Sequence, residues 1–178
     1  MEIERKFLIK ELPTDLEKYT CLHLEQAYLC TEPVVRVRQE NNEYYMTYKG
    51  SGLMAREEAN LPLTKESYEH LAEKADGLVI KKDRYVIPLA DPDFSLRAFV
   101  AQGISPKAAA TMVKDLTLHI ELDIFKSPKG LIMAEVEFPN IETARAFVKP
   151  TWFGEDVTNN KAYHNSNMSK GGEIFKAE

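Results

Sequence analysis

Hydrophobic and polar residues alternate with a period of two in many short segments of the chain. In 35–38, for example, Val35 and Val37 alternate with Arg36 and Arg38, and in 118–124 every second side chain is apolar, with His119, Glu121 and Asp123 between them. This period is typical of strands with one buried face, and the turn residues between the segments favour antiparallel pairing. The predicted strands are 2–9, 25–30, 34–40, 44–49, 54–63, 79–88, 117–125 and 132–138, which are enough to close a barrel.

Other segments carry the residues that begin and end helices. Threonine or serine precedes two of them as a candidate N-cap, and a glycine or a proline follows two. Because the apolar faces of the strands need cover, we predict an α+β fold that is mainly antiparallel β, with the helices packed on the outside. The predicted helices are 65–76 after Thr64 and before Gly77, 105–116 with Ser105 as the cap and Pro106 in the first turn, 141–148 before Pro150, and a short one from Asn160 towards Lys170.

The chain is expected to form one domain, 1–178, because no repeat, low-complexity stretch or linker divides its 178 residues. The last residues, 171–178, are predicted to be a loose tail. No apolar stretch approaches the roughly 18 to 20 residues that a membrane span requires, so no membrane partner is expected. With no signal peptide visible, we expect a cytoplasmic protein.

The net charge and the cysteines limit the kinds of partner and metal site that we expect. The net charge of −5 does not favour nucleic acid as a partner. The two cysteines, Cys21 and Cys30, have no histidine or cysteine companion at a spacing typical of metal ligands, so we interpret them as reduced thiols.

Charged side chains share one face of the predicted strands. A solvated sheet with a charged outer face would also show this pattern, but here the charges are sorted, with pairs of glutamates on some strands and pairs of arginines on others. The face holds seven basic and seven acidic residues: Lys6, Arg36, Arg38, Lys49, Arg56, Lys82 and Arg84, against Glu2, Glu4, Glu58, Glu121, Asp123, Glu135 and Glu137.

This sorting predicts a phosphate site beside a metal site. Residues two apart on a strand lie roughly 7 Å apart on the same face, so Arg36 and Arg38 repel each other unless an anion lies against them. The paired glutamates require a cation, and Mg²⁺ or Mn²⁺ prefers carboxylate oxygens and substrate phosphates. A barrel lined in this way has the composition of a phosphoryl-transfer site.

The motifs in chain order resemble the CYTH superfamily, also called triphosphate tunnel metalloenzymes. The resemblance rests on EIERK, RVR, TYKG, KDRYVIP, HIELDIF and GLIMAEVEF, together with the closing segment WFGEDVTNNKAYHNSNMSK. It implies a closed eight-stranded tunnel with helices outside, which binds a triphosphate and one or two divalent ions. Three positions depart from the family. Asn60 stands where the family often has a glutamate, and Ala162 stands before Tyr163 where the family often has a basic residue, with Lys161 one position away as its expected substitute. Residues 91–117 are longer than the family's usual connection and are predicted to be an insertion.

The resemblance also implies roles for the charged residues. Glu2, Glu4 and Glu137 correspond to ligands of a first Mg²⁺ or Mn²⁺ ion, and Asp123 and Glu135, with Glu137 shared, to those of a second. Lys82 is predicted to have a lowered pKa and to assist proton transfer or orient the water. The predicted phosphate contacts are Lys6, Arg36, Arg38, Lys49, Arg56, Arg84 and Lys161, and Glu58, His119 and Glu121 are predicted to support the site from around these residues.

The function expected from these residues is metal-dependent hydrolysis of inorganic triphosphate by in-line attack of water on a terminal phosphorus. The alternatives are a class IV adenylyl cyclase that converts ATP to cyclic AMP and pyrophosphate, a thiamine triphosphatase, and a protein that binds phosphates or nucleotides without catalysis. The substrate is thus a small-molecule triphosphate. The oligomeric state stays open, with a homodimer as one possibility.

Overall fold

The computed structural model describes residues 2–50 and 55–171, and the side chains of residues 2, 55 and 56 lie outside this description. Strands dominate, as predicted, and they form one ten-stranded antiparallel sheet. The strands are β1 (Glu2–Ile9), β2 (Thr20–Thr31), β3 (Val34–Glu40), β4 (Glu43–Lys49), β5 (Ala55–Arg56), β6 (Glu58–Pro62), β7 (Asp76–Leu89), β8 (Leu118–Ser127), β9 (Ile132–Glu137) and β10 (Phe153–Asp156).

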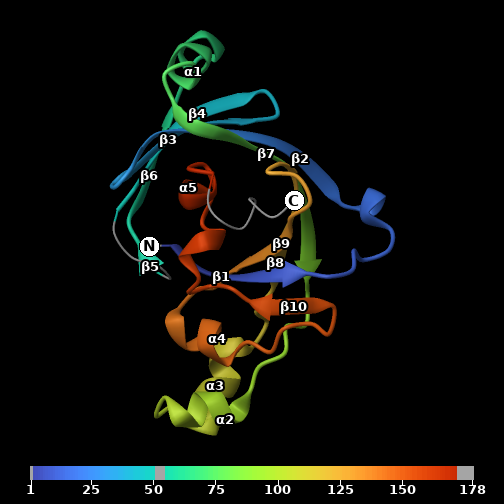
Figure 1. The fold of residues 1–178 in the computed structure, drawn as a ribbon. Helices are drawn as coiled ribbons and strands as arrows, with labels where there is room; N and C mark the ends of the chain where they lie inside the picture. The colour runs from blue at the N-terminus through green and yellow to red at the C-terminus, as the bar shows by residue number, and fades with distance from the viewer. Residues whose placement is uncertain (1, 51–54, 172–178) are drawn as a thin grey trace.

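The sheet is strongly curled around a central space, but it is not the closed eight-stranded barrel that the resemblance implies (Figure 1). Its strand order is β10-β1-β9-β8-β7-β2-β3-β4-β6, and β5 pairs separately with the start of β1. Glu57 lies between β5 and β6 and belongs to neither strand, although its carbonyl oxygen accepts from the Gly50 nitrogen at 3.0 Å. β5 pairs with β1 and β6 with β4, so the two hydrogen-bond ladders follow each other along the chain and do not overlap. The prediction of a closed barrel was therefore wrong in this respect. The covalent chain between β5 and β6, and not a ladder of hydrogen bonds, connects the two edges of the sheet.

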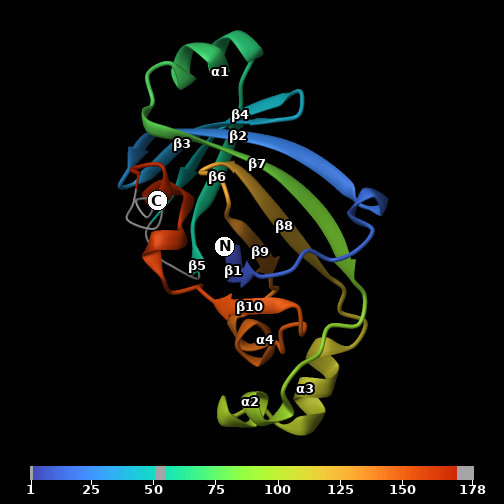
Figure 2. The ribbon, with the colours of Figure 1, turned by 45° about the vertical axis from the view of Figure 1, so that its right-hand side comes forward.

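Helices cover the outer face of the sheet (Figures 1 and 2), which confirms the α+β prediction. One group packs below β1 and β10, another helix lies over β3 and β4, and a short one lies by the central space. They are the 3-10 turns η1 (Leu16–Lys18) and η2 (Lys161–Tyr163) and the helices α1 (Lys65–Ala72), α2 (Leu96–Ala101), α3 (Pro106–Val113), α4 (Ile141–Ala146) and α5 (Asn165–Met168).

The main core lies between the sheet and α4. Phe7 is fully buried there, with its ring centroid 4.9 Å from that of Phe153. Arg5 points to the same outer face and donates hydrogen bonds from Nη1 to the carbonyl oxygens of Ala144 at 2.9 Å and Phe147 at 3.1 Å. A guanidinium at these last carbonyls satisfies acceptors that the helix leaves open, so it fixes α4 against β1.

Residues 91–117 hold two helices, of which the sequence patterns predicted only the second. Phe99 of α2, Ala109 of α3 and Ala146 of α4 share a small core, so the pair packs on α4 outside the sheet. Caps start both helices: Ser95 Oγ accepts from the backbone nitrogen of Ala98 and Ser105 Oγ from that of Ala108, each at 3.2 Å.

The inner face of the curl is apolar near α5. Met168 of α5 is fully buried in a cluster with Tyr28, Val34, Ile80, Phe125 and Met133, which come from five strands. Gly77 permits this packing because it has φ +74 and a Cβ there would lie 2.2 Å from the carbonyl oxygen of Ser169. The predicted closing helix is thus split into η2 and α5, and α5 seals an apolar part of the inner face.

Within the described residues, no helix combines the length and the hydrophobicity needed to cross a lipid bilayer.

Candidate active site

The inward side chains enclose a cavity of about 140 Å³ with a strongly polar lining. Most of the predicted charged residues are found there, and they come from seven strands. The lining residues are Glu4, Lys6, Tyr28, Val34, Arg36, Arg38, Lys49, Glu58, Arg84, Glu121, Glu135, Glu137, His164, Asn165 and Ser166. The period-two pattern therefore identified the face correctly.

Arg84 on β7 is the centre of a buried ion-pair network. Its Nε and Nη2 donate to the two carboxylate oxygens of Asp123 at 2.7 Å each, and Nη2 also donates to Glu135 Oε2 at 2.7 Å. Its Nη1 pairs with Glu121. Burial alone would lower the pKa of Arg84, but the three carboxylates raise it well above its usual value. Arg84 is thus a fixed positive charge in the wall of the cavity.

Lys6 on β1 bridges two glutamates of the same wall. Its Nζ pairs with Glu135 and lies 3.0 Å from Glu4 Oε1. Burial opposes the charge of Lys6, yet these two carboxylates outweigh it and raise its pKa. The pKa of Glu135 falls well below its usual value, because Lys6, Lys82 and Arg84 together outweigh the penalty of burial. Both partners are therefore ionised at neutral pH.

Lys82 and Asp123 lie behind the cavity wall. Lys82 is 1% exposed, its Nζ pairs with Asp123, and it lies 5.2 Å from the centre of the Phe125 ring. Burial and the neighbouring charge of Arg84 lower the pKa of Lys82 to about 8, although Asp123 and Glu135 act in the opposite direction. The predicted lowering of this pKa agrees with the structure, but Lys82 contacts Asp123 and does not line the cavity.

Glu137 lies where several carboxylates converge. Partial burial and the negative charges of Glu121, Glu4 and Glu58 raise the pKa of Glu137 above its usual value. A divalent cation bound among these oxygens would remove the repulsion, and an all-oxygen set suits a hard ion. Among the described residues, however, these carboxylates do not form a group of three with ligand oxygens within 4.8 Å of one another.

Arg36 and Arg38 form the other side of the cavity. Arg36 is 4% exposed, and its Nε is buried without a hydrogen-bond partner. Within the described residues neither arginine pairs with a carboxylate. Burial together with the charges of Arg36 and Arg84 lowers the pKa of Arg38. Arg36 is buried and Arg38 is partly buried, and such a pair of guanidinium groups, which no described carboxylate neutralises, has the chemistry to bind an anion such as phosphate.

Two neutral residues that sequence reasoning missed hold Arg38 in place. Gln26 Oε1 accepts hydrogen bonds from Arg38 Nη2 at 2.9 Å and Nε at 3.3 Å. The hydroxyl of Tyr45 accepts from Arg38 Nη1 at 3.2 Å and donates to Glu40 Oε2 at 2.9 Å. Gln26 is fully buried and faces inward from β2, two residues before Tyr28. Its position in the alternation was the available indication, but it carries no charge.

The remaining predicted residues are spread around this centre. Lys49 pairs with Glu58 Oε2 at 2.6 Å, and both line the cavity. Lys161 is exposed in η2 and does not line the cavity, whereas His164, which follows η2, lines it and is 7% exposed.

The other predicted residues lie away from the cavity or outside the description. His119 is exposed in a separate surface depression beside Glu121 and Glu137. Glu2 and Arg56 are paired through their backbones, and their side chains lie outside the described residues.

Known proteins are similar to this chain in sequence and in fold. It is 34% identical over 172 residues to an inorganic triphosphatase of Nitrosomonas europaea, covering 94% of this chain and 96% of that protein. It is 29% identical to an inorganic triphosphatase of Acetivibrio thermocellus, covering 95% and 93%. A crystal structure of an inorganic triphosphatase superposes with a TM-score of 0.61 at 29% identity, covering 96% and 95%. The model of the CYTH domain family matches residues 1–166, and the chain belongs to this family.

Proposed function

We propose that this protein hydrolyses inorganic triphosphate to phosphate and pyrophosphate. Two relatives that match nearly the whole chain are inorganic triphosphatases, and so is the protein of the similar crystal structure. The enzyme is thus a hydrolase of phosphoric anhydride bonds.

One observation carries this proposal. No described carboxylate pairs with Arg36 or Arg38, which lie on one side of a cavity whose other side gathers Glu4, Glu58 and Glu137. A phosphate chain supplies oxygens for the guanidinium groups and, with a cation, for the carboxylates. A cavity built only to be solvated would not bury Arg36 Nε without a partner, because an unsatisfied donor costs about 1–3 kcal/mol.

The family is metal-dependent, and the residues in the cavity fit a hard divalent ion. We propose Mg²⁺ or Mn²⁺, held by Glu2, Glu4 and Glu137. A second ion at the predicted ligands Asp123 and Glu135 would have to displace the cationic groups that pair with them in this structure. Arg84 and the two lysines already neutralise Asp123 and Glu135, so the crowded Glu137 is the described carboxylate that fits a cation best. When bound, the ion would polarise phosphate oxygens and lower the pKa of the attacking water.

The residues of the chain have distinct tasks in this reaction. Arg36 and Arg38 bind and orient the phosphate oxygens, and Lys49 and Lys6 add positive charge along the cavity. The oxygen of a water molecule attacks the terminal phosphorus, the bond from that phosphorus to the bridging oxygen breaks, and pyrophosphate leaves with the electron pair. Because Lys82 contacts Asp123 and not the cavity, we propose that it positions Asp123 and does not touch the substrate.

A substrate panel with matched variants tests the proposal. Phosphate release is measured from inorganic triphosphate, thiamine triphosphate, ATP and pyrophosphate with Mg²⁺ or Mn²⁺, and cyclic AMP is assayed with ATP. We expect inorganic triphosphate to have the highest kcat/KM, and Arg36→Met to lower it roughly 10- to 100-fold, the equivalent of about 1.5–3 kcal/mol for hydrogen bonds to a charged group.

The control for Arg36→Met is Lys81→Met, which removes an exposed lysine that pairs with Glu25 on the outer face of β7. This variant should keep the kcat/KM of the unmodified protein. Cyclic AMP formation at a rate comparable to triphosphate cleavage, or equal losses in both variants, would contradict the proposal.

A further inference from the structure

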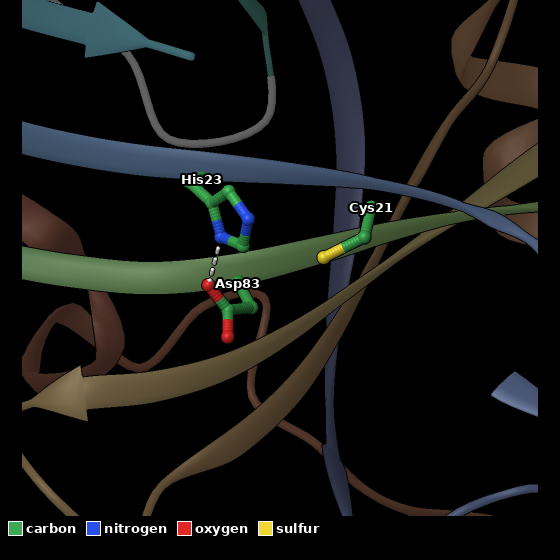
Figure 3. A group of neighbouring side chains, drawn as sticks. All are labelled: Cys21, His23 and Asp83. Carbon is green, nitrogen blue, oxygen red and sulfur yellow. Dashed lines mark hydrogen bonds and ion pairs between the residues drawn. The ribbon is translucent and has the colours of Figure 1, made fainter. Parts of the chain in front are cut away.

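Three side chains with metal-binding atoms meet on the outer face of the sheet (Figure 3). Cys21 and His23 lie two residues apart on β2, and Asp83 stands opposite His23 on β7. One ligand atom from each lies within 4.8 Å of the others, and His23 Nδ1 is 2.6 Å from Asp83 Oδ1. Because Asp83 lies between the inward-facing Lys82 and Arg84, this cluster is on the opposite side of the sheet from the cavity.

The backbone holds the cluster in register. β2 and β7 pair continuously through Cys21↔Tyr85 and His23↔Asp83. Asn41, at the turn that follows β3, also clamps His23: its Oδ1 accepts from the His23 backbone nitrogen and its own nitrogen donates to the His23 carbonyl, both at 2.9 Å. The ligand-bearing residues are therefore fixed by two strands and a turn before any ion binds, which lowers the entropy cost of binding.

The donor set points to a different class of ion from the cavity. A thiolate sulfur, an imidazole nitrogen and a carboxylate oxygen suit Zn²⁺ and similar borderline ions, whereas Mg²⁺ prefers oxygen alone. Three protein ligands with one remaining position for water is a common arrangement for Zn²⁺. The side chain of His23 is 68% exposed, so an ion can reach it from solvent.

We propose that Cys21, His23 and Asp83 form a binding site for Zn²⁺ or a similar borderline divalent ion, separate from the catalytic cavity. Binding releases the thiol proton of Cys21 and replaces the hydrogen bond between His23 and Asp83 with two bonds to the ion. No other group of three such ligand atoms meets the same distance limit in the described part of the chain.

Lys126 competes for this site. Its Nζ donates to Asp83 Oδ1 at 2.8 Å, while its side chain is 58% exposed. An incoming cation must displace this ammonium group from the carboxylate and is repelled by its charge. Removing the amine should therefore strengthen metal binding by about 2- to 5-fold, the range of an exposed ion pair.

The first experiment uses Co²⁺ as a probe, with excess Mg²⁺ to occupy the oxygen ligands of the cavity and with the thiols kept reduced. A cysteine ligand produces thiolate-to-cobalt charge-transfer absorption, which carboxylates in the cavity cannot produce. We expect this band in the unmodified protein and in Cys30→Ser, which removes the exposed cysteine of the same strand, but not in Cys21→Ser. Triphosphatase activity should be unchanged in Cys21→Ser, which shows that the variant is folded.

The second experiment measures Zn²⁺ affinity by equilibrium dialysis with and without Lys126→Gln. We expect the affinity to rise in this variant, and the melting temperature to rise with Zn²⁺ in the unmodified protein by more than in Cys21→Ser. The proposal is overturned if the unmodified protein shows no charge-transfer band, if Cys21→Ser retains it, or if only Cys30→Ser loses it.

Discussion

Replacing Gln26 by glutamate would change one charge beside Arg38 in a nearly isosteric way. Gln26 is fully buried, and its Oε1 already accepts two hydrogen bonds from Arg38, at 2.9 and 3.3 Å. A carboxylate at this position would keep both hydrogen bonds and convert them into an ion pair. The positive charge that Arg38 offers to a phosphate would then be largely cancelled.

The size of this effect follows from Coulomb's law. With the new carboxylate roughly 6 Å from a bound phosphate charge and an effective dielectric constant of about 20, the added repulsion is about 3 kcal/mol. Neighbouring Arg36 and solvent reduce it, so we expect KM for inorganic triphosphate to rise about 10- to 100-fold. Gln26→Met keeps the volume and loses the hydrogen bonds to Arg38 without adding charge. Arg38 then keeps its full positive charge for the phosphate, so KM should rise by less than about 10-fold, the equivalent of about 1 kcal/mol for a hydrogen bond that only orients the guanidinium group.

Steady-state phosphate release gives kcat and KM for both variants, and thermal unfolding shows whether each is folded. The glutamate variant should unfold at or above the temperature of the methionine variant, because it retains contacts to Arg38. If KM rose only because a variant was poorly folded, Gln26→Met would show the larger rise in KM. The charge argument predicts the opposite, a larger rise in Gln26→Glu. If Gln26→Glu keeps the KM of the unmodified protein, Arg38 is not a phosphate contact and the assignment of this side of the cavity fails.

Three further predictions concern charge and packing. Glu137→Gln should lower metal-dependent activity by at least the roughly 10- to 100-fold seen for indirect metal contacts. Without metal its melting temperature should be equal or higher, because burial and the neighbouring carboxylates raise the pKa of Glu137 and so disfavour its charge. A lower melting temperature would contradict this. The pKa of Lys82 is lowered from 10.5 to about 8, so the unfolded state binds more protons between these pH values, and stability should rise across this window by up to about 3 kcal/mol. Denaturant unfolding of Lys82→Met should lack this rise, and an identical pH profile would refute it. Gly77→Ala should destabilise the fold by about 1–3 kcal/mol or more, whereas Gly103→Ala, at φ +79 with no atom within 4 Å of its Cβ, isolates the cost of backbone strain; equal losses would show that contact with Ser169 is unimportant.

Alternation along the strands predicted which residues face inward, since side-chain direction follows from strand geometry alone. Glu4, Lys6, Arg36, Arg38 and Arg84 were found on one face for this reason. How deeply a side chain is buried on that face depends on which helix packs against it. The alternation of apolar and polar residues does not contain this information. Lys82 and Asp123 are therefore on the correct face but behind the cavity wall, beneath the apolar cluster that Phe125 and α5 form.

Closure of the sheet and contacts between distant residues depend on which strands pair with each other. The sheet is not closed by hydrogen bonds because β5 pairs with β1 while β6 pairs with β4, and the alternation in 54–63 does not reveal this change of partner. Likewise, Cys21 and Asp83 lie 62 positions apart in the chain, and only the pairing of β2 with β7 brings them together. In the closing segment, Lys161 was predicted from the family's basic residue beside the tyrosine, and which side chain of this segment reaches the cavity depends on how η2 and α5 pack, so the prediction did not find His164.

The charge balance of the cavity explains why a phosphate chain and a cation belong there together. Among the described lining residues, five basic side chains face five acidic ones, so the wall is neutral as a whole. The two signs are nevertheless separated. Arg84 and Lys6 are neutralised by ion pairs, whereas Arg36 and Arg38 have no carboxylate partner in the part of the chain that the structure describes. A bare triphosphate would bring several uncompensated negative charges into a neutral, partly buried space, and a cation alone would leave the arginines unsatisfied. A triphosphate bound together with divalent cations satisfies both sides without changing the net charge by much, so the sorted charges favour the pair over either ion alone.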